Sequence, residues 1–214
     1  LGRHRVMCGD STSKEDVERL MDGKKADITF TSPPYNAGSL CIKGNPNTMP
    51  KYIDVIDSID ENSYGEFIEN AFQNMVGVSL EAFINIGLVE GNKRPVIKFI
   101  NNNRDIFKDV IYWVKRSAAP HITPGVINNR VEPIYCFGDG TRRFKGAQFT
   151  QGTYFNVISG ENASGNEYAS IHKATFPISL PSNIIMNFCK LNGSVFDPFL
   201  GSGTTLIACE QLDR

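Results

Sequence analysis

An alternation of short apolar runs with segments of helical periodicity constrains the fold of this chain more than any other feature. The runs with the length and composition of strands are Arg5–Cys8, Asp27–Thr31, Ala82–Ile86, Phe107–Val114, Pro133–Phe137 and Ser194–Asp197. The helical segments are Ser13–Met21, Tyr64–Leu80, Asn92–Asn102, Pro181–Cys189 and a helix that begins near Gly203. Strands that alternate with helices predict an α/β fold, with a mostly parallel twisted sheet flanked by helices. Such sheets bind ligands at the carboxyl ends of their strands.

Two long segments interrupt this alternation. Residues 36–63 contain Gly, Asn, Pro and Ser with little periodicity, so we expect a mobile loop there. Residues 138–170 are rich in Gly, Asn, Thr and Ser, and they predict a small insertion made of a loop and a hairpin. At 214 residues, the chain has the length of a single domain, 1–214, with such an insertion.

The composition is that of a soluble enzyme, with 41% hydrophobic and 21% charged residues. No apolar run approaches the roughly 18 residues that a membrane helix needs, so no membrane association is predicted. The five cysteines are scattered and form no C-x-x-C pair, which argues against a disulfide framework and a zinc site. We expect no metal and a reducing, cytoplasmic setting.

The charge is unevenly distributed along the chain. The formal net charge is −1, yet residues 91–145 carry eleven lysines and arginines and four acidic residues, a local charge of +7. Such asymmetry predicts a surface that faces phosphate groups on an otherwise neutral protein. The alternative is that these charges cover the solvated faces of unrelated elements.

The first motif is T-S-P-P-Y-N at residues 31–36, directly after an apolar strand. Its two prolines fix the backbone and remove two donors, which leaves carbonyl groups pointing out of a rigid turn. The Ser32 hydroxyl and the Pro33 carbonyl suit the two N–H bonds of an amino group, and Tyr35 suits stacking on a flat ring. A pair of prolines that only ends a strand is the alternative.

The second motif is D-P-F-L-G-S-G-T-T at residues 197–205, where a strand passes into a helix. Glycines at such a junction let the backbone approach a ligand, and the first N–H groups of the helix bind polar atoms. The motif lacks the lysine of a P-loop and the third glycine of a dinucleotide fingerprint. It therefore indicates a different ligand.

Taken in this order, the two motifs resemble those of the β-class DNA amino-methyltransferases, which act on N4 of cytosine or N6 of adenine. In that class the catalytic motif precedes the cofactor motif, a circularly permuted order of the Rossmann-like methyltransferase fold. R-H-R-V-M-C-G-D-S-T at residues 3–12 is similar to the opening segment of the class. H-K-A-T-F-P at residues 172–177 is similar to the segment before the glycine motif, so the resemblance covers nearly the whole chain.

The resemblance implies S-adenosylmethionine as cofactor, double-stranded DNA as partner and a possible homodimer. It places the target base against Ser32, Pro33, Pro34 and Tyr35. The implied cofactor contacts are Asp10 at the adenine end, Phe176 and Pro177 packed on the cofactor, and Asp197, Phe199, Gly201, Ser202, Gly203 and Thr204 around its methionine part. Asp10 and Asp197 as ordinary turn or capping acids are the alternatives.

These residues predict direct methyl transfer to the exocyclic amino group of a base flipped out of the duplex, without a covalent intermediate. Serine before Pro-Pro is more usual in the N4-cytosine enzymes of the class, so it favours cytosine slightly over adenine. The alternatives are an RNA or protein-amide methyltransferase and a non-catalytic nucleic-acid-binding module. The class implies target recognition by residues 138–170. The chain ends before the ribose-binding acid of the class, so we expect a truncated domain with weak cofactor affinity.

Overall fold

The computed structural model describes residues 2–37, 58–117, 124–160 and 176–214. Its sheet has six strands in the order β5-β3-β4-β2-β1-β6 among these residues. The strands are β1 (Ala26–Thr31), β2 (Ser79–Asn85), β3 (Phe107–Lys115), β4 (Val131–Phe137), β5 (Val157–Gly160) and β6 (Val195–Phe196). The predicted α/β architecture is therefore confirmed.

The sheet is mixed, with a parallel half that contains β1 at its centre. β1 pairs in parallel with both β2 and β6, and β3 pairs in parallel with β5. β4 runs antiparallel to β2 and to β3. β3 and β4 follow each other in the chain, and a strand that returns beside its predecessor without a crossover must run antiparallel.

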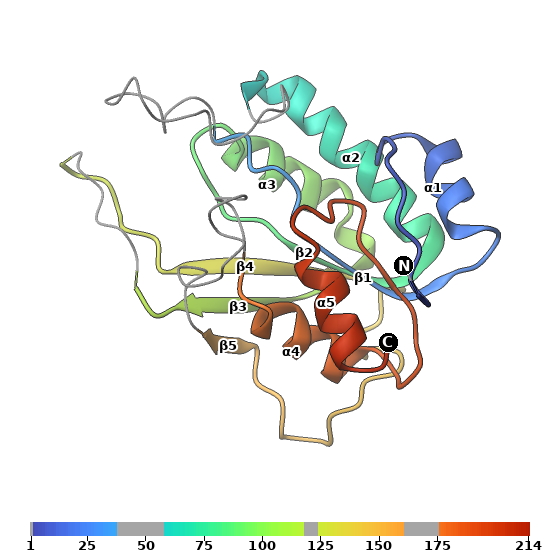
Figure 1. Ribbon diagram of the computed structural model, residues 1–214. Coiled ribbons are helices and arrows are strands. Elements are labelled where there is room, and N and C mark those ends of the chain that lie inside the picture. Colours follow the sequence, from blue (N-terminus) through green and yellow to red (C-terminus); the bar gives the residue numbers. More distant parts are fainter. Residues whose placement is uncertain (1, 38–57, 118–123, 161–175) are drawn as a thin grey trace, which may run out of the picture.

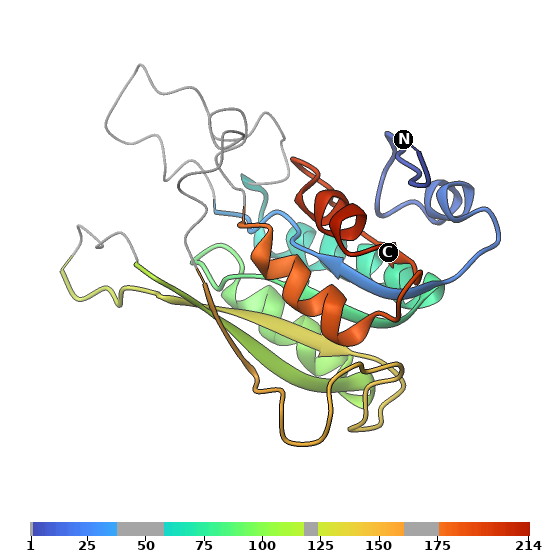
Figure 2. The ribbon, with the colours of Figure 1, turned by 60° about the horizontal axis from the view of Figure 1, so that its bottom comes forward.

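Helices cover both faces of the sheet, which makes a three-layer arrangement (Figures 1 and 2). The helices are α1 (Lys14–Met21), α2 (Glu61–Val78), α3 (Lys93–Asn102), α4 (Ser179–Phe188) and α5 (Thr204–Gln211). α2 and α3 lie on one face, whereas α4 and α5 lie on the other. The Ser13 hydroxyl caps α1 by accepting from the Asp16 N–H at 3.2 Å, as the sequence predicts.

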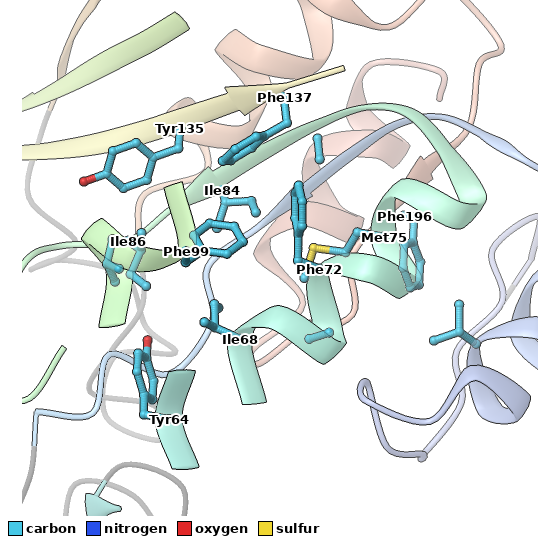
Figure 3. Close-up of a cluster of buried hydrophobic side chains, with 14 of the residues drawn as sticks. Tyr64, Ile68, Phe72, Met75, Ile84, Ile86, Phe99, Tyr135, Phe137 and Phe196 are labelled. Atoms are coloured by element: carbon cyan, nitrogen blue, oxygen red, sulfur yellow. The ribbon is translucent and has the colours of Figure 1, made fainter. Parts of the chain in front are cut away.

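Successive residues of each strand supply the two cores, because side chains alternate between the faces of a sheet. In β2, Ile84 packs with α2 and α3, whereas Phe83 packs with α4. In the first core, the Phe72 ring of α2 lies 4.9 Å from that of Phe99 and 4.7 Å from that of Phe137 (Figure 3). This packing joins α2 and α3 to the face of the sheet at β4, where Phe137 lies opposite Ala82 of β2.

The segment before α1 corrects one prediction. Residues 5–8 form no strand, and Val6 is half exposed. Arg5 is instead held by Asp22 at the end of α1, with 3.0 Å between the guanidinium nitrogen and the carboxylate oxygen. A short apolar run without a neighbouring strand to bond remains extended coil. The helix predicted from Tyr64 begins at Glu61, because Asp60 caps it, so the predicted loop 36–63 is too long by three residues.

Residues 138–156 lead from β4 to β5 and pack on the α4 face of the sheet. Phe144, Phe149 and Tyr154 surround Phe188 of α4, with ring centroids 4.9, 5.4 and 5.2 Å from it. Residues 157–160 form β5, an edge strand parallel to β3 rather than part of a hairpin. Residues 161–170 of the predicted insertion and 38–57 of the predicted loop lie outside the described residues. No helix in the described ranges is long and apolar enough to span a bilayer.

Candidate active site

The two sequence motifs meet at the carboxyl ends of two adjacent strands. β1 leads into Ser32 and β6 leads into Asp197, and the parallel register places Thr29 opposite Phe196. Two residues further along β1, the Thr31 hydroxyl donates a 2.6 Å hydrogen bond to Oδ1 of Asp197. Segments separated by 166 residues in the chain are thus joined directly. The strand ends that carry the two motifs therefore lie side by side.

The turn after β6 has a backbone that glycine allows. Gly201 and Gly203 have φ values of +54° and +82°, in the left-handed region that L residues rarely adopt. α5 begins at Thr204, and no side chain within the described residues caps it. The Ser202 and Thr204 hydroxyls lie 3.0 Å apart. The N–H groups of the first turn of α5 are therefore available to a ligand.

A cavity of about 580 Å³ runs along β6 between the N-terminal segment, α1 and α5. Its volume lies in the range of small-molecule sites. Asp10 and Asp197 line it, together with Leu200 of the glycine turn. Asp197 Oδ2 is buried and has no hydrogen bond of good geometry among the described residues. Burial raises the pKa of the Asp197 carboxyl, although the nearby Thr205 hydroxyl of α5 favours its charged form. A buried acceptor beside a cavity suits a cationic or N–H donor group of a ligand, such as the ammonium of a bound amino acid moiety.

Asp10 serves a turn and also faces the cavity. Its Oδ1 accepts from the backbone N–H and the hydroxyl of Thr12, at 2.8 and 2.7 Å. These hydrogen bonds lower the pKa of the Asp10 carboxyl. The Asp10 N–H in turn donates to Asp16 of α1 at 2.8 Å. The turn therefore fixes an ionised carboxylate at the cavity wall, so the structural role does not exclude ligand binding.

Among the residues predicted at the cofactor, Asp10 and Asp197 line this cavity, whereas Phe176, Pro177, Phe199, Gly201, Ser202, Gly203 and Thr204 do not. The predicted base-binding residues Ser32, Pro33, Pro34 and Tyr35 are also outside its lining. The Phe199 ring packs on Phe67 of α2, with centroids 5.6 Å apart. Phe176 makes an edge contact of 5.8 Å with Phe30 of β1. The Pro177 carbonyl accepts from the Leu180 N–H at the start of α4. Their cofactor contacts stay predictions.

The turn after β1 is held rigidly by polar side chains around it. Tyr64 of α2 donates to the Pro34 carbonyl at 2.7 Å, and the Asn92 amide donates to the Tyr35 carbonyl at 2.7 Å. The Asn36 amide donates to the carbonyls of Ile59 and Gly91. In the part of the chain that the structure describes, no hydrogen bond reaches the Pro33 carbonyl. That carbonyl remains an acceptor for a substrate.

The Tyr35 side chain connects this turn to the antiparallel half of the sheet. Ser32 donates to the Tyr35 hydroxyl at 3.3 Å. Asn85 Oδ1 at the end of β2 and Glu132 Oε2 in β4 each lie 3.2 Å from the same hydroxyl. Sequence reasoning missed Asn85 and Glu132, because their strands are 50 and 97 residues away from Tyr35. The one available signal was their position at strand ends.

The basic stretch 91–145 does not form one phosphate-facing surface in its entirety. The Lys108 side chain is fully buried and pairs with Glu81 at 3.4 Å and Asp139 at 2.9 Å. Lys145 also pairs with Asp139, at 3.1 Å. Lys108 therefore stabilises residues 139–143 and is unavailable to DNA. The prediction that the basic residues of 91–145 face phosphate groups is therefore wrong for Lys108.

Comparisons with known proteins agree with this geometry. A family model described as DNA methylase matches residues 26–214. The type II methyltransferase M.MjaI of Methanocaldococcus jannaschii is 23% identical over 260 aligned residues, which cover 99% of this chain and 84% of the relative. The type II methyltransferase M.SmaI of Serratia marcescens is 38% identical over 53 residues, which are 25% of this chain and 18% of that relative.

The fold is also found in solved protein structures. The crystal structure of the M1.HpyAVI–SAM complex superposes with a TM-score of 0.63 at 19% identity, covering 98% of this chain and 90% of that one. The sheet, its flanking helices and the glycine turn define a Rossmann-like methyltransferase domain. The family match covers most of its length, and the chain belongs to the family of N6/N4 DNA methylases. S-adenosylmethionine is the methyl donor of this family.

Proposed function

We propose that this chain transfers a methyl group from S-adenosylmethionine to the exocyclic amino group of a base flipped out of double-stranded DNA. The observation that carries the proposal is the hydrogen bond between Thr31 and Asp197, which joins the strand end before Ser32 to the first residue of the glycine motif. Methyl transfer between two bound reactants depends mainly on holding them in a reactive geometry. Two rigid turns on adjacent strands provide such a geometry.

The target amino group binds to the turn after β1. The Ser32 hydroxyl donates its proton toward Tyr35, which leaves both oxygen lone pairs as acceptors. The Pro33 carbonyl supplies the second acceptor. The amino nitrogen gains positive charge as the new N–C bond forms, and these two acceptors stabilise that charge. No covalent bond to the protein is required.

The cofactor binds in the cavity between the N-terminal segment and the glycine turn. Asp197 offers its buried Oδ2 to the cationic methionine end, and the N–H groups at the start of α5 bind its carboxylate. Asp10 accepts from the adenine amino group at the opposite part of the cavity. When bound, S-adenosylmethionine supplies an electrophilic methyl group on a sulfonium.

In the class of enzymes that this chain resembles, serine before Pro-Pro is more usual where the target is cytosine than where it is adenine. We therefore propose N4 of cytosine as the preferred target. Target recognition by residues 138–170, a homodimer and a cytoplasmic setting belong to the same proposal. Residues 138–156 support only part of it, because Phe144, Phe149 and Tyr154 pack against the core, whereas Phe155 is exposed.

A transfer assay with tritiated S-adenosylmethionine tests the proposal. DNA, RNA and protein are offered as acceptors to the protein, to Ser32→Ala and to the control Ser182→Ala on α4. We expect label in DNA, a loss of about 10²-fold in kcat for Ser32→Ala, as for removal of one oxyanion-hole donor elsewhere, and no change for the control. Label in RNA or protein alone identifies a different substrate class. Absence of label in every acceptor indicates a binding module.

A further inference from the structure

The Tyr35 side chain extends from the turn after β1 to β2 and β4, where its hydroxyl lies beside Asn85 and Glu132. We propose that Glu132 is a positioning residue for the Tyr35 ring, holding it through the phenol hydroxyl while Lys115 holds Glu132. The inference deepens the proposed function, since it concerns the ring that stacks on the target base. It assigns a role to an ion pair in β3 and β4 that neither sequence motif contains.

The backbone of Tyr35 is already fixed, so only its side-chain torsions are left to control. Asn92 holds the carbonyl of Tyr35, and Tyr64 holds the carbonyl before it. A tyrosine side chain has two rotatable torsions. Anchoring the hydroxyl fixes χ1 and hence the axis of the ring, whereas rotation about that axis is limited by the packing of the ring on Gly87.

The hydroxyl has one proton and two acceptors at equal distance. Asn85 Oδ1 and Glu132 Oε2 both lie 3.2 Å from it. An ionised carboxylate is the stronger acceptor of the two, so the proton points mainly at Glu132. Burial, and next the negative charge of Glu132, raise the pKa of Tyr35 well above its ordinary value. The phenol therefore stays protonated and remains a donor at any working pH.

The second carboxylate oxygen of Glu132, Oε1, is bound by Lys115. Lys115 Nζ forms an ion pair with Glu132 Oε1 and lies 5.0 Å from the centre of the Trp113 ring. The antiparallel register of β3 and β4 places Trp113 opposite Glu132. The anchor thus stands on paired strands, which hold a side chain more firmly than a loop does.

Gly87, just after β2, limits the ring from a second side. A Cβ atom at this position would lie 3.0 Å from Cε2 of Tyr35 and 3.5 Å from Cγ of Glu132. The Tyr35 ring therefore packs directly on the backbone of Gly87 while its hydroxyl reaches Glu132. Ring and carboxylate form one contiguous contact with the end of β2.

A double-mutant cycle separates positioning from plain structural support. Glu132→Leu, Glu132→Gln and Tyr35→Phe are compared with the pair Tyr35→Phe/Glu132→Leu. Glu69→Leu on α2 is the control, because Glu69 binds Asn103 and has no contact with Tyr35. We expect Glu132→Leu to lower kcat about 10- to 100-fold, as for misplaced groups elsewhere, with the KM for S-adenosylmethionine unchanged. Glu132→Gln retains an acceptor and restores most of the activity.

In the Tyr35→Phe background we expect no further loss from Glu132→Leu, because the hydroxyl through which Glu132 acts is gone. Equal losses in both backgrounds would overturn the proposal. A second measurement is independent of activity: ¹⁹F NMR of protein labelled with 3-fluorotyrosine, with the Tyr35 signal assigned by its absence in Tyr35→Phe. Glu132→Leu should shift that signal and Glu69→Leu should leave it in place. An unmoved signal refutes positioning, whereas an inactive wild-type protein refutes only the proposed function.

Discussion

Removal of the Thr31 hydroxyl tests whether the contact between the two motifs is an energetic link. Thr31→Val keeps the shape of a fully buried side chain but removes the donor to Asp197. A hydrogen bond to a charged group contributes about 1.5–3 kcal/mol. Since about 1.4 kcal/mol is a factor of ten, the unfolding equilibrium should shift roughly 10- to 150-fold toward the unfolded state.

Thr29→Val provides a matched control on the same strand and the same face. The Thr29 hydroxyl is also buried, but it lies 2.8 Å from the neutral Ser79 hydroxyl, which keeps a second bond to the Met75 carbonyl. Its loss should cost about 1 kcal/mol. Urea denaturation measures both variants, and calorimetry with S-adenosylmethionine should show weakened binding for Thr31→Val only. Equal destabilisation and equal affinity in the two variants would refute the link.

Three further perturbations have distinct expected outcomes. Burial raises the folded-state pKa of Asp197, so the charge on this residue opposes folding. The urea stability of Asp197→Asn relative to wild type should therefore increase as the pH rises above the ordinary aspartate pKa of about 4, whereas its cofactor affinity should fall. A hydrogen bond from Lys108 lowers the folded-state pKa of Asp139, so Asp139→Asn should be less stable than wild type at pH 7. This difference in stability should become smaller as acid protonates the wild-type carboxyl. A difference that does not change with pH would contradict this prediction. Gly203→Ala, at a φ of +82°, should cost about 1–2 kcal/mol by denaturation, whereas Gly77→Ala in α2 should add up to about 1 kcal/mol.

The sequence predicts the parallel half of the sheet and the place where the motifs meet. T-S-P-P-Y and D-P-F-L-G-S-G-T-T each follow an apolar strand, and the carboxyl ends of parallel strands lie together. The structure brings Ser32 and Asp197 to adjacent strand ends, as this argument requires. Local pattern is sufficient here because each motif contains its own strand, turn and chemistry.

The antiparallel half was less predictable, because its key contacts join residues that no local pattern connects. Glu132 enters the site only through the register of β3 and β4, and hydrophobic periodicity does not determine that register between distant strands. Lys108 illustrates the same limit, since composition places it in a basic stretch whereas the fold buries it against Glu81. The expected strand at residues 5–8 was wrong because periodicity does not reveal whether a partner strand exists.

Nucleoside analysis of DNA methylated by this protein tests the central claim most directly. DNA incubated with the protein and S-adenosylmethionine bearing a deuterated methyl group is digested to nucleosides, which are separated and identified by mass spectrometry. We predict label on an exocyclic amino nitrogen, as N4-methylcytosine in preference to N6-methyladenine, and loss of that product with Ser32→Ala. Label at carbon 5 of cytosine, or no labelled nucleoside at all, would contradict a site built from the Ser32 hydroxyl and the Pro33 carbonyl.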